Sequence, residues 1–96
     1  EALPYLNALL ELAPNRVDLW LEQGSLYEEL ERWKEAEQSY RQAIHLQPEH
    51  VEALNRLAFL LHAKGQREEA KRLWQRSLEL NPDQWEIEEQ LLREEP

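Results

Sequence analysis

The chain has 96 residues and a formal net charge of −9, with 20 acidic and 11 basic residues and no cysteine or methionine. This length allows one small domain with a modest core. The absence of cysteine excludes disulfides and thiolate metal sites, and the acidic balance disfavours nucleic acid and anionic membrane surfaces as partners.

Six helices are predicted in chain order, because apolar side chains recur every three or four residues. Pro4 fits the first turn of the first helix, where its missing amide has no helical partner. Proline or glycine marks most of the connections. The predicted helices are Ala2–Ala13, Val17–Glu31, Lys34–Leu46, Val51–Ala63, Arg67–Leu80 and Gln84–Arg93.

The pattern of residues 17–50 is repeated 34 residues later, in residues 51–84. The pairs in register include Ala36 with Ala70 and Tyr40 with Trp74. The register extends into residues 1–14 and 85–96, so the pattern starts and stops within a repeat. Because the first residue is also not methionine, we expect a piece of a longer protein. A fixed period of this length predicts a solenoid of stacked helix pairs.

The repeated residues resemble those of the tetratricopeptide repeat (TPR) family. The motif of the first copy is Trp20-x2-Gln23-Gly24-x2-Tyr27, Ala36-x3-Tyr40, Ala43 and Pro48; that of the second is Leu54-x2-Leu57-Ala58-x2-Leu61, Ala70-x3-Trp74, Ser77 and Pro82. The small residues fall where paired helices approach most closely. A generic antiparallel bundle would not require this recurrence. Leucine is usual at Gln23, and we expect a weakened core contact there.

The resemblance implies an all-α, antiparallel helix-hairpin solenoid forming one segment over residues 1–96. In this register, residues 1–14 are the second helix of a preceding repeat, 17–50 and 51–84 are full repeats, and 85–96 are a capping helix. Glu88 and Glu95 would form the polar outer face of that helix.

No catalytic residue, metal site or cofactor is predicted. The three histidines, His45, His50 and His62, do not form the i,i+4 pair that presents two imidazoles to a metal, and we interpret them as solvated. Two glycines are too few for a phosphate-binding loop. We therefore expect that this segment is not an enzyme.

The TPR resemblance implies a concave groove lined by the first helix of each repeat. The predicted partner-binding residues are Leu21, Ser25, Glu28, Asn55, Phe59, His62, Glu89 and Arg93. Leu21 and Phe59 lie outside the predicted packing stripe of their helices, and we expect them to be exposed anchors. The alternative is that Phe59 packs on a neighbouring helix and Leu21 is an ordinary surface leucine.

Some TPR domains hold the C-terminal carboxylate of a chaperone peptide with Lys, Asn, Asn, Lys and Arg. The matching positions here hold Leu21, Ser25, Arg56, Glu86 and Gln90. None of the clamp residues is retained, so we predict that the segment is not a receptor for chaperone tails. Trp33 and Trp85 lie outside the motif. Trp33, at the turn between paired helices, is expected to pack, and Trp85 is expected to cover the end of the preceding helix, with an intermolecular contact as the alternative.

The main functional prediction is a scaffold or protein-interaction module that binds a protein or peptide with basic and apolar side chains. Two alternatives remain open: a structural or oligomerisation segment that self-associates through its end faces, or a non-catalytic arm of an enzyme. A basic set on the helix 67–80, with the acidic groove, would also suit self-association; it comprises Arg67, Lys71, Arg72 and Arg76. No apolar run could span a membrane, and we take the chain as soluble, with a cytoplasmic location as the working assignment.

Overall fold

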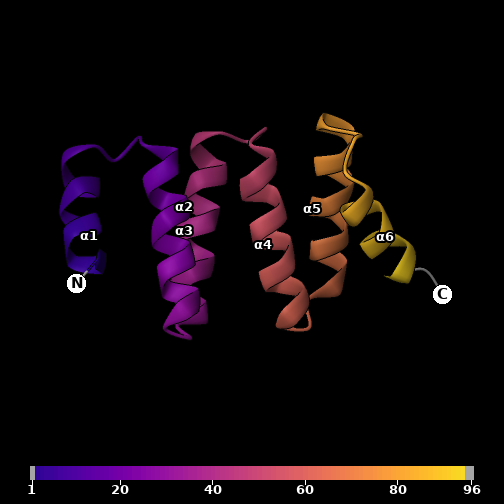
Figure 1. The fold of residues 1–96 in the computed structure, drawn as a ribbon, viewed down its shortest axis with the longest axis horizontal. Helices are drawn as coiled ribbons and strands as arrows, with labels where there is room; N and C mark the ends of the chain where they lie inside the picture. The colour runs from indigo at the N-terminus through magenta and orange to yellow at the C-terminus, as the bar shows by residue number, and fades with distance from the viewer. Residues whose placement is uncertain (1, 95–96) are drawn as a thin grey trace. The chain divides into compact units, whose positions relative to one another are not determined.

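The computed structural model describes residues 2–94, which form six α-helices and no strand. This confirms the all-α prediction. Two of the predicted ranges, 51–63 and 67–80, match the observed helices, whereas α2 ends two residues earlier and α3 begins one residue earlier than predicted. The helices are α1 Ala2–Leu12, α2 Val17–Glu29, α3 Trp33–Leu46, α4 Val51–Ala63, α5 Arg67–Leu80 and α6 Trp85–Glu94 (Figure 1).

The chain divides into two compact units, residues 1–48 and 49–96. In the first unit, α2 lies along α3 and also contacts α1 (Figure 1). In the second unit, α4 lies along α5, which also contacts α6. Glu95, predicted in the polar outer face, lies outside the described residues, as do residue 1 and residue 96. No helix within residues 2–94 is both long enough and apolar enough to cross a membrane.

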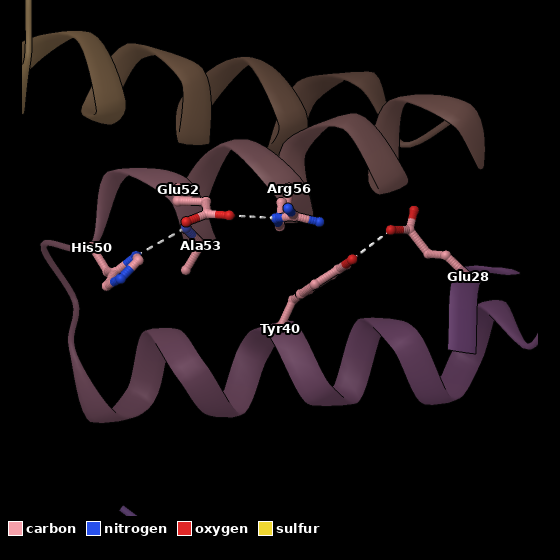
Figure 2. A network of polar contacts seen from close by, with 6 residues as sticks. All are labelled: Glu28, Tyr40, His50, Glu52, Ala53 and Arg56. Carbon is pink, nitrogen blue, oxygen red and sulfur yellow. Dashed lines mark hydrogen bonds and ion pairs between the residues drawn. The ribbon is translucent and has the colours of Figure 1, made fainter. Parts of the chain in front are cut away.

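Helices α2 and α3 approach each other closely at Gly24. A Cβ atom built on Gly24 would lie 2.7 Å from Cδ1 of the Tyr40 ring, so only glycine fits. Tyr40 is fully buried. Its hydroxyl donates a hydrogen bond to the Glu28 carboxylate, which lies one turn after Gly24 on α2 (Figure 2). The small residue thus allows the tyrosine to reach across α2.

A polar bridge joins all three helices of the first unit through the buried side chain of Gln23. The amide Nε2 of Gln23 donates to Asn7 Oδ1 of α1 at 2.6 Å, and its Oε1 accepts from Ser39 Oγ of α3 at 2.7 Å. Gln23 was predicted to weaken a core contact. Instead, both ends of its amide are satisfied, which is the condition for burying a polar group without a large cost.

Trp74 of α5 is a fully buried residue of the second unit's core, and its ring contacts the rings of Phe59 and His62 on α4. The N-terminus of α4 is capped by His50, whose Nδ1 accepts from the Ala53 amide at 3.2 Å (Figure 2). On the next turn, Arg56 Nε donates to Glu52 at 2.9 Å. The cap requires an unprotonated Nδ1, so His50 is not simply a solvated histidine as predicted.

Candidate functional site

A cavity of about 400 Å³ lies in the second unit, between α4 and the start of α6. Two α4 residues form one side, and the connection after α5 with the first turn of α6 forms the other. Its volume falls in the range of about 300–1,000 Å³ that is common for ligand sites. The lining residues are Asn55, Phe59, Asp83, Gln84, Trp85, Glu86 and Ile87.

Phe59 connects this cavity to the core. Its ring packs edge-on against Trp74, with 5.1 Å between the ring centroids and 70° between the planes. The residue nevertheless remains 46% exposed. Phe59 therefore packs on a neighbouring helix while remaining partly exposed, and its role as a partner anchor stays a prediction.

Gln84 holds the cavity wall in place at the N-terminal cap of α6. Its Nε2 donates to Ser77 Oγ at 2.9 Å and to the Asn81 carbonyl at 2.9 Å. Since Nε2 faces these acceptors, Oε1 is left to accept from Asn55 Nδ2 at 2.8 Å. The orientation of the Asn55 side-chain amide is thereby fixed, with Nδ2 towards Gln84. Its Oδ1 is buried and has no hydrogen-bond partner among the described residues.

Trp85, Asp83 and Glu86 form the exposed rim of the cavity. Trp85, the first residue of α6, is 69% exposed, which does not fit the expectation that it covers the end of the preceding helix; the alternative of an intermolecular contact stays a prediction. Both carboxylate residues are exposed, and neither has an ion-pair partner within residues 2–94. The rim therefore combines an aromatic surface with two uncompensated negative charges.

His62 lies one turn beyond Phe59 on α4 and contacts α6. Its Nε2 is 3.0 Å from Glu94 Oε2, and its ring lies 5.5 Å from that of Trp74, at 47°. The prediction of a solvated histidine is wrong here, because the side chain sits between an aromatic ring and a carboxylate from the end of α6. Of the three histidines, only His45 is exposed.

The predicted binding residues of the first unit do not line this cavity. Leu21 was expected to be exposed but is only 7% exposed. It follows Val17 by four residues and precedes Gly24 by three, so these residues form one helical stripe, and all three are buried. Ser25 is half-buried. Glu28 is occupied by the Tyr40 hydroxyl and is not a free carboxylate.

The remaining two predicted residues, Glu89 and Arg93, are exposed on α6 and pair with each other. Arg93 Nη2 lies 3.6 Å from Glu89 Oε1, at the i,i+4 spacing of a helix. Neither lines the cavity. Among the described residues, no group of three or more histidines, cysteines and carboxylates could hold a metal ion. The cavity itself is lined by aromatic, amide and carboxylate side chains and by Ile87.

Two family models with the description "Tetratricopeptide repeat" match the chain, one over residues 29–92 and the other over residues 1–50. Among curated proteins, the chain is similar to the Caenorhabditis elegans "Tetratricopeptide repeat-containing protein trd-1", with 37% identity over 89 residues, which is 90% of this chain and 12% of that protein. It is also similar to the "Probable biofilm formation methyltransferase WspC" of Pseudomonas aeruginosa, with 45% identity over 58 residues, or 60% of this chain and 13% of that protein. The chain thus spans about an eighth of the length of these two relatives.

Solved structures give the same fold. One is the first TPR of Spaghetti (RPAP3) bound to HSP90 peptide SRMEEVD, with a TM-score of 0.87, 26% identity, and coverage of 96% of this chain and 73% of that chain. Another is YrrB, described as a TPR protein with an unusual peptide-binding site, with a TM-score of 0.82, 23% identity, and coverage of 92% of this chain and 45% of that chain. The second likeness concerns the fold alone.

Proposed function

Because the chain belongs to the tetratricopeptide repeat family, we propose that it is a protein-interaction module that binds a peptide segment of a partner protein. The binding surface is the cavity of the second unit, with Phe59 and Trp85 as anchors. The preferred ligand carries basic and apolar side chains. Leu21, which is buried, is no longer part of this proposal.

The observation that carries the proposal is the exposure of two large aromatic residues at one cavity. Phe59 is 46% exposed and Trp85 is 69% exposed, and both line it. Exposed aromatic residues beside a cavity are typical of contact surfaces, because they bury a large area at a small entropic cost. The peptide-bound Spaghetti domain, similar over 96% of this chain, is consistent with this role.

The peptide seen in the Spaghetti complex, SRMEEVD, is not the expected ligand. It is acidic and ends in a carboxylate. The cavity rim here carries Asp83 and Glu86, with no basic lining residue, so like charges would meet. We therefore expect no micromolar binding of this peptide. Measurable binding would contradict the predicted preference for basic ligands.

The proposal can be tested by selecting peptides from a random library on the immobilised chain and mapping the best binder by NMR. The backbone amides of Asn55, Gln84 and Trp85, the side-chain amides of Asn55 and Gln84 and the indole N–H of Trp85 are expected to shift on titration. Shifts confined to other surfaces, or a selection without any binder, would refute the proposal. The Leu21→Glu variant is unsuitable as a binding test, because a buried charge there would unfold the first unit.

A second candidate function is self-association through the terminal helices. Apolar side chains are exposed on both, among them Leu12 of α1, 84% exposed, and Leu92 of α6, 72% exposed. Light scattering at high protein concentration and low salt tests this directly. Oligomers that form in the wild type and are lost in Leu12→Ser or Leu92→Ser would support self-association. A monomer under all conditions would exclude it.

The role proposed for this segment is binding, not catalysis, whatever activity a longer parent protein has. Similarity to WspC, a protein named as a methyltransferase, is compatible with the alternative of a non-catalytic arm of an enzyme. The proposed cytoplasmic location is a working assignment that cell fractionation of the parent protein would test.

A further inference from the structure

We infer that the cavity between α4 and α6 receives an arginine side chain of the partner. This inference rests on the proposed function and specifies the ligand chemistry at the same cavity. It is carried by two features of the lining residues: uncompensated negative charge and exposed aromatic surface.

The charge at the cavity has one sign. Asp83 and Glu86 line it, and no lysine or arginine does. Neither carboxylate is paired with a cation within residues 2–94. By contrast, Glu52 on α4 is neutralised by Arg56 of the same helix. A cationic ligand group would therefore find two charges that no residue of the described part of the chain already occupies.

The aromatic surface selects for a cation that can also stack. Phe59 and Trp85 line the same cavity and both remain partly exposed. A guanidinium group is planar, weakly hydrated and attracted to the face of an aromatic ring. An apolar ligand side chain would use the rings but would desolvate Asp83 and Glu86 without compensation.

Hydrogen-bond geometry favours arginine over lysine. The guanidinium offers five N–H donors in a fixed plane, whereas an ammonium group is a compact point charge. The acceptors at the cavity are the carboxylates of Asp83 and Glu86. Several N–H donors in one plane can serve both carboxylates together, whereas the three hydrogens of an ammonium group radiate from a single nitrogen.

The test uses three blocked peptides of one sequence, in which arginine, lysine or citrulline stands between leucines. Citrulline keeps the shape and most donors of arginine but not the charge. Binding is followed by NMR through the indole N–H of Trp85 and the side-chain amide of Asn55. We expect the arginine peptide to bind about tenfold more tightly than the citrulline peptide, because citrulline loses a hydrogen bond to a charged group. The affinity of the lysine peptide should lie between these two.

Variants locate the effect. Replacing both carboxylates, Asp83→Asn with Glu86→Gln, should remove the arginine preference while the citrulline peptide binds as before. Glu79→Gln, which removes an exposed charge of α5 that does not line the cavity, should change nothing. Circular dichroism of each variant verifies that the helices are intact.

The inference fails if citrulline and arginine peptides bind the cavity equally, or if the preference survives loss of both carboxylates; peptide binding as such would then still stand. If no peptide of this series shifts the cavity resonances, while a library-selected binder does, the arginine inference is overturned and the proposed function is retained. If no binder of any kind reaches the cavity, both fail.

Discussion

Glu31 and Gly65, which are 34 residues apart, adopt the same left-handed backbone conformation, with φ of 59° and 88°. Each follows the first helix of its hairpin and closes it in the same way. The Arg32 amide donates to the Tyr27 carbonyl at 2.8 Å, and the Gln66 amide donates to the Leu61 carbonyl at 2.9 Å. This is the hydrogen-bond pattern of a Schellman C-terminal cap, in which glycine is the favoured residue.

Glu31→Gly should therefore stabilise the chain. The left-handed conformation is unfavourable for a residue with a Cβ atom, and replacing Glu31 with glycine should raise the free energy of unfolding by about 1 kcal/mol. For a domain of this size, this corresponds to a rise of about 4–8 °C in melting temperature. The reciprocal change, Gly65→Glu, should lower the melting temperature by a similar amount. Thermal denaturation followed by circular dichroism measures both. A lower melting temperature for Glu31→Gly would contradict the assigned turn geometry.

Gly24→Ala tests the close approach of α2 and α3. Helix propensity alone would make alanine more stable than glycine by about 1 kcal/mol. The Tyr40 ring leaves no room for the added methyl group, and overpacking of a core costs about 1–3 kcal/mol. We expect net destabilisation in a denaturant titration. Ser25→Ala, one residue further along α2, serves as the control and should change stability by less than about 0.5 kcal/mol.

The ion pair at the start of α2 gives a prediction about pH. Arg16 donates through Nε and Nη2 to the two oxygens of Asp18, at 3.0 and 2.7 Å. This hydrogen bonding, together with the guanidinium charge, lowers the pKa of the Asp18 carboxyl in the folded chain. A carboxyl whose pKa is lowered by folding stabilises the fold above its ordinary pKa of about 3.9, and the contribution is lost as the pH falls through the folded-state pKa.

Carboxyl ¹³C shifts recorded during an acid titration measure that pKa directly. In Arg16→Gln, the pKa of Asp18 should rise towards its ordinary value. Both side chains are exposed, so the effect on overall stability should be small and should decrease with added salt. An unchanged Asp18 titration in this variant would show that the pair does not form in solution.

The helices could be predicted because each apolar pattern recurs 34 residues away, so that two stretches of sequence support the same assignment. The candidate binding residues were harder to predict. Leu21 was misplaced because α2 contacts both α1 and α3, so more of its surface is buried than one packed face would account for. Leu21 shares a buried stripe with Val17 and Gly24. The buried Gln23 bonds to both neighbouring helices, through Asn7 of α1 and Ser39 of α3.

Only the α4 side of the cavity could be predicted from the sequence. Asn55 and Phe59 follow from the helix register, which places them on the face of α4 away from its motif residues. Gln84 lies outside the helices, at a position where the repeat pattern imposes no residue, and its hydrogen bonds to Ser77 and Asn55 depend on the folded connection. Trp85 aligns with Val17 and Val51, so its size suggested burial. Only the geometry at the start of α6 reveals its exposure.

The central claim is that the aromatic cavity of the second unit binds the partner peptide. Its most direct test is calorimetric titration of a library-selected peptide into the wild-type chain, Phe59→Glu and Trp33→Glu. Trp33 is a matched control, because it is 44% exposed against 46% for Phe59, receives the same charge, and does not line the cavity. We predict at least about tenfold weaker binding for Phe59→Glu and unchanged affinity for Trp33→Glu. Equal affinity of wild type and Phe59→Glu, with helicity intact, would contradict the claim.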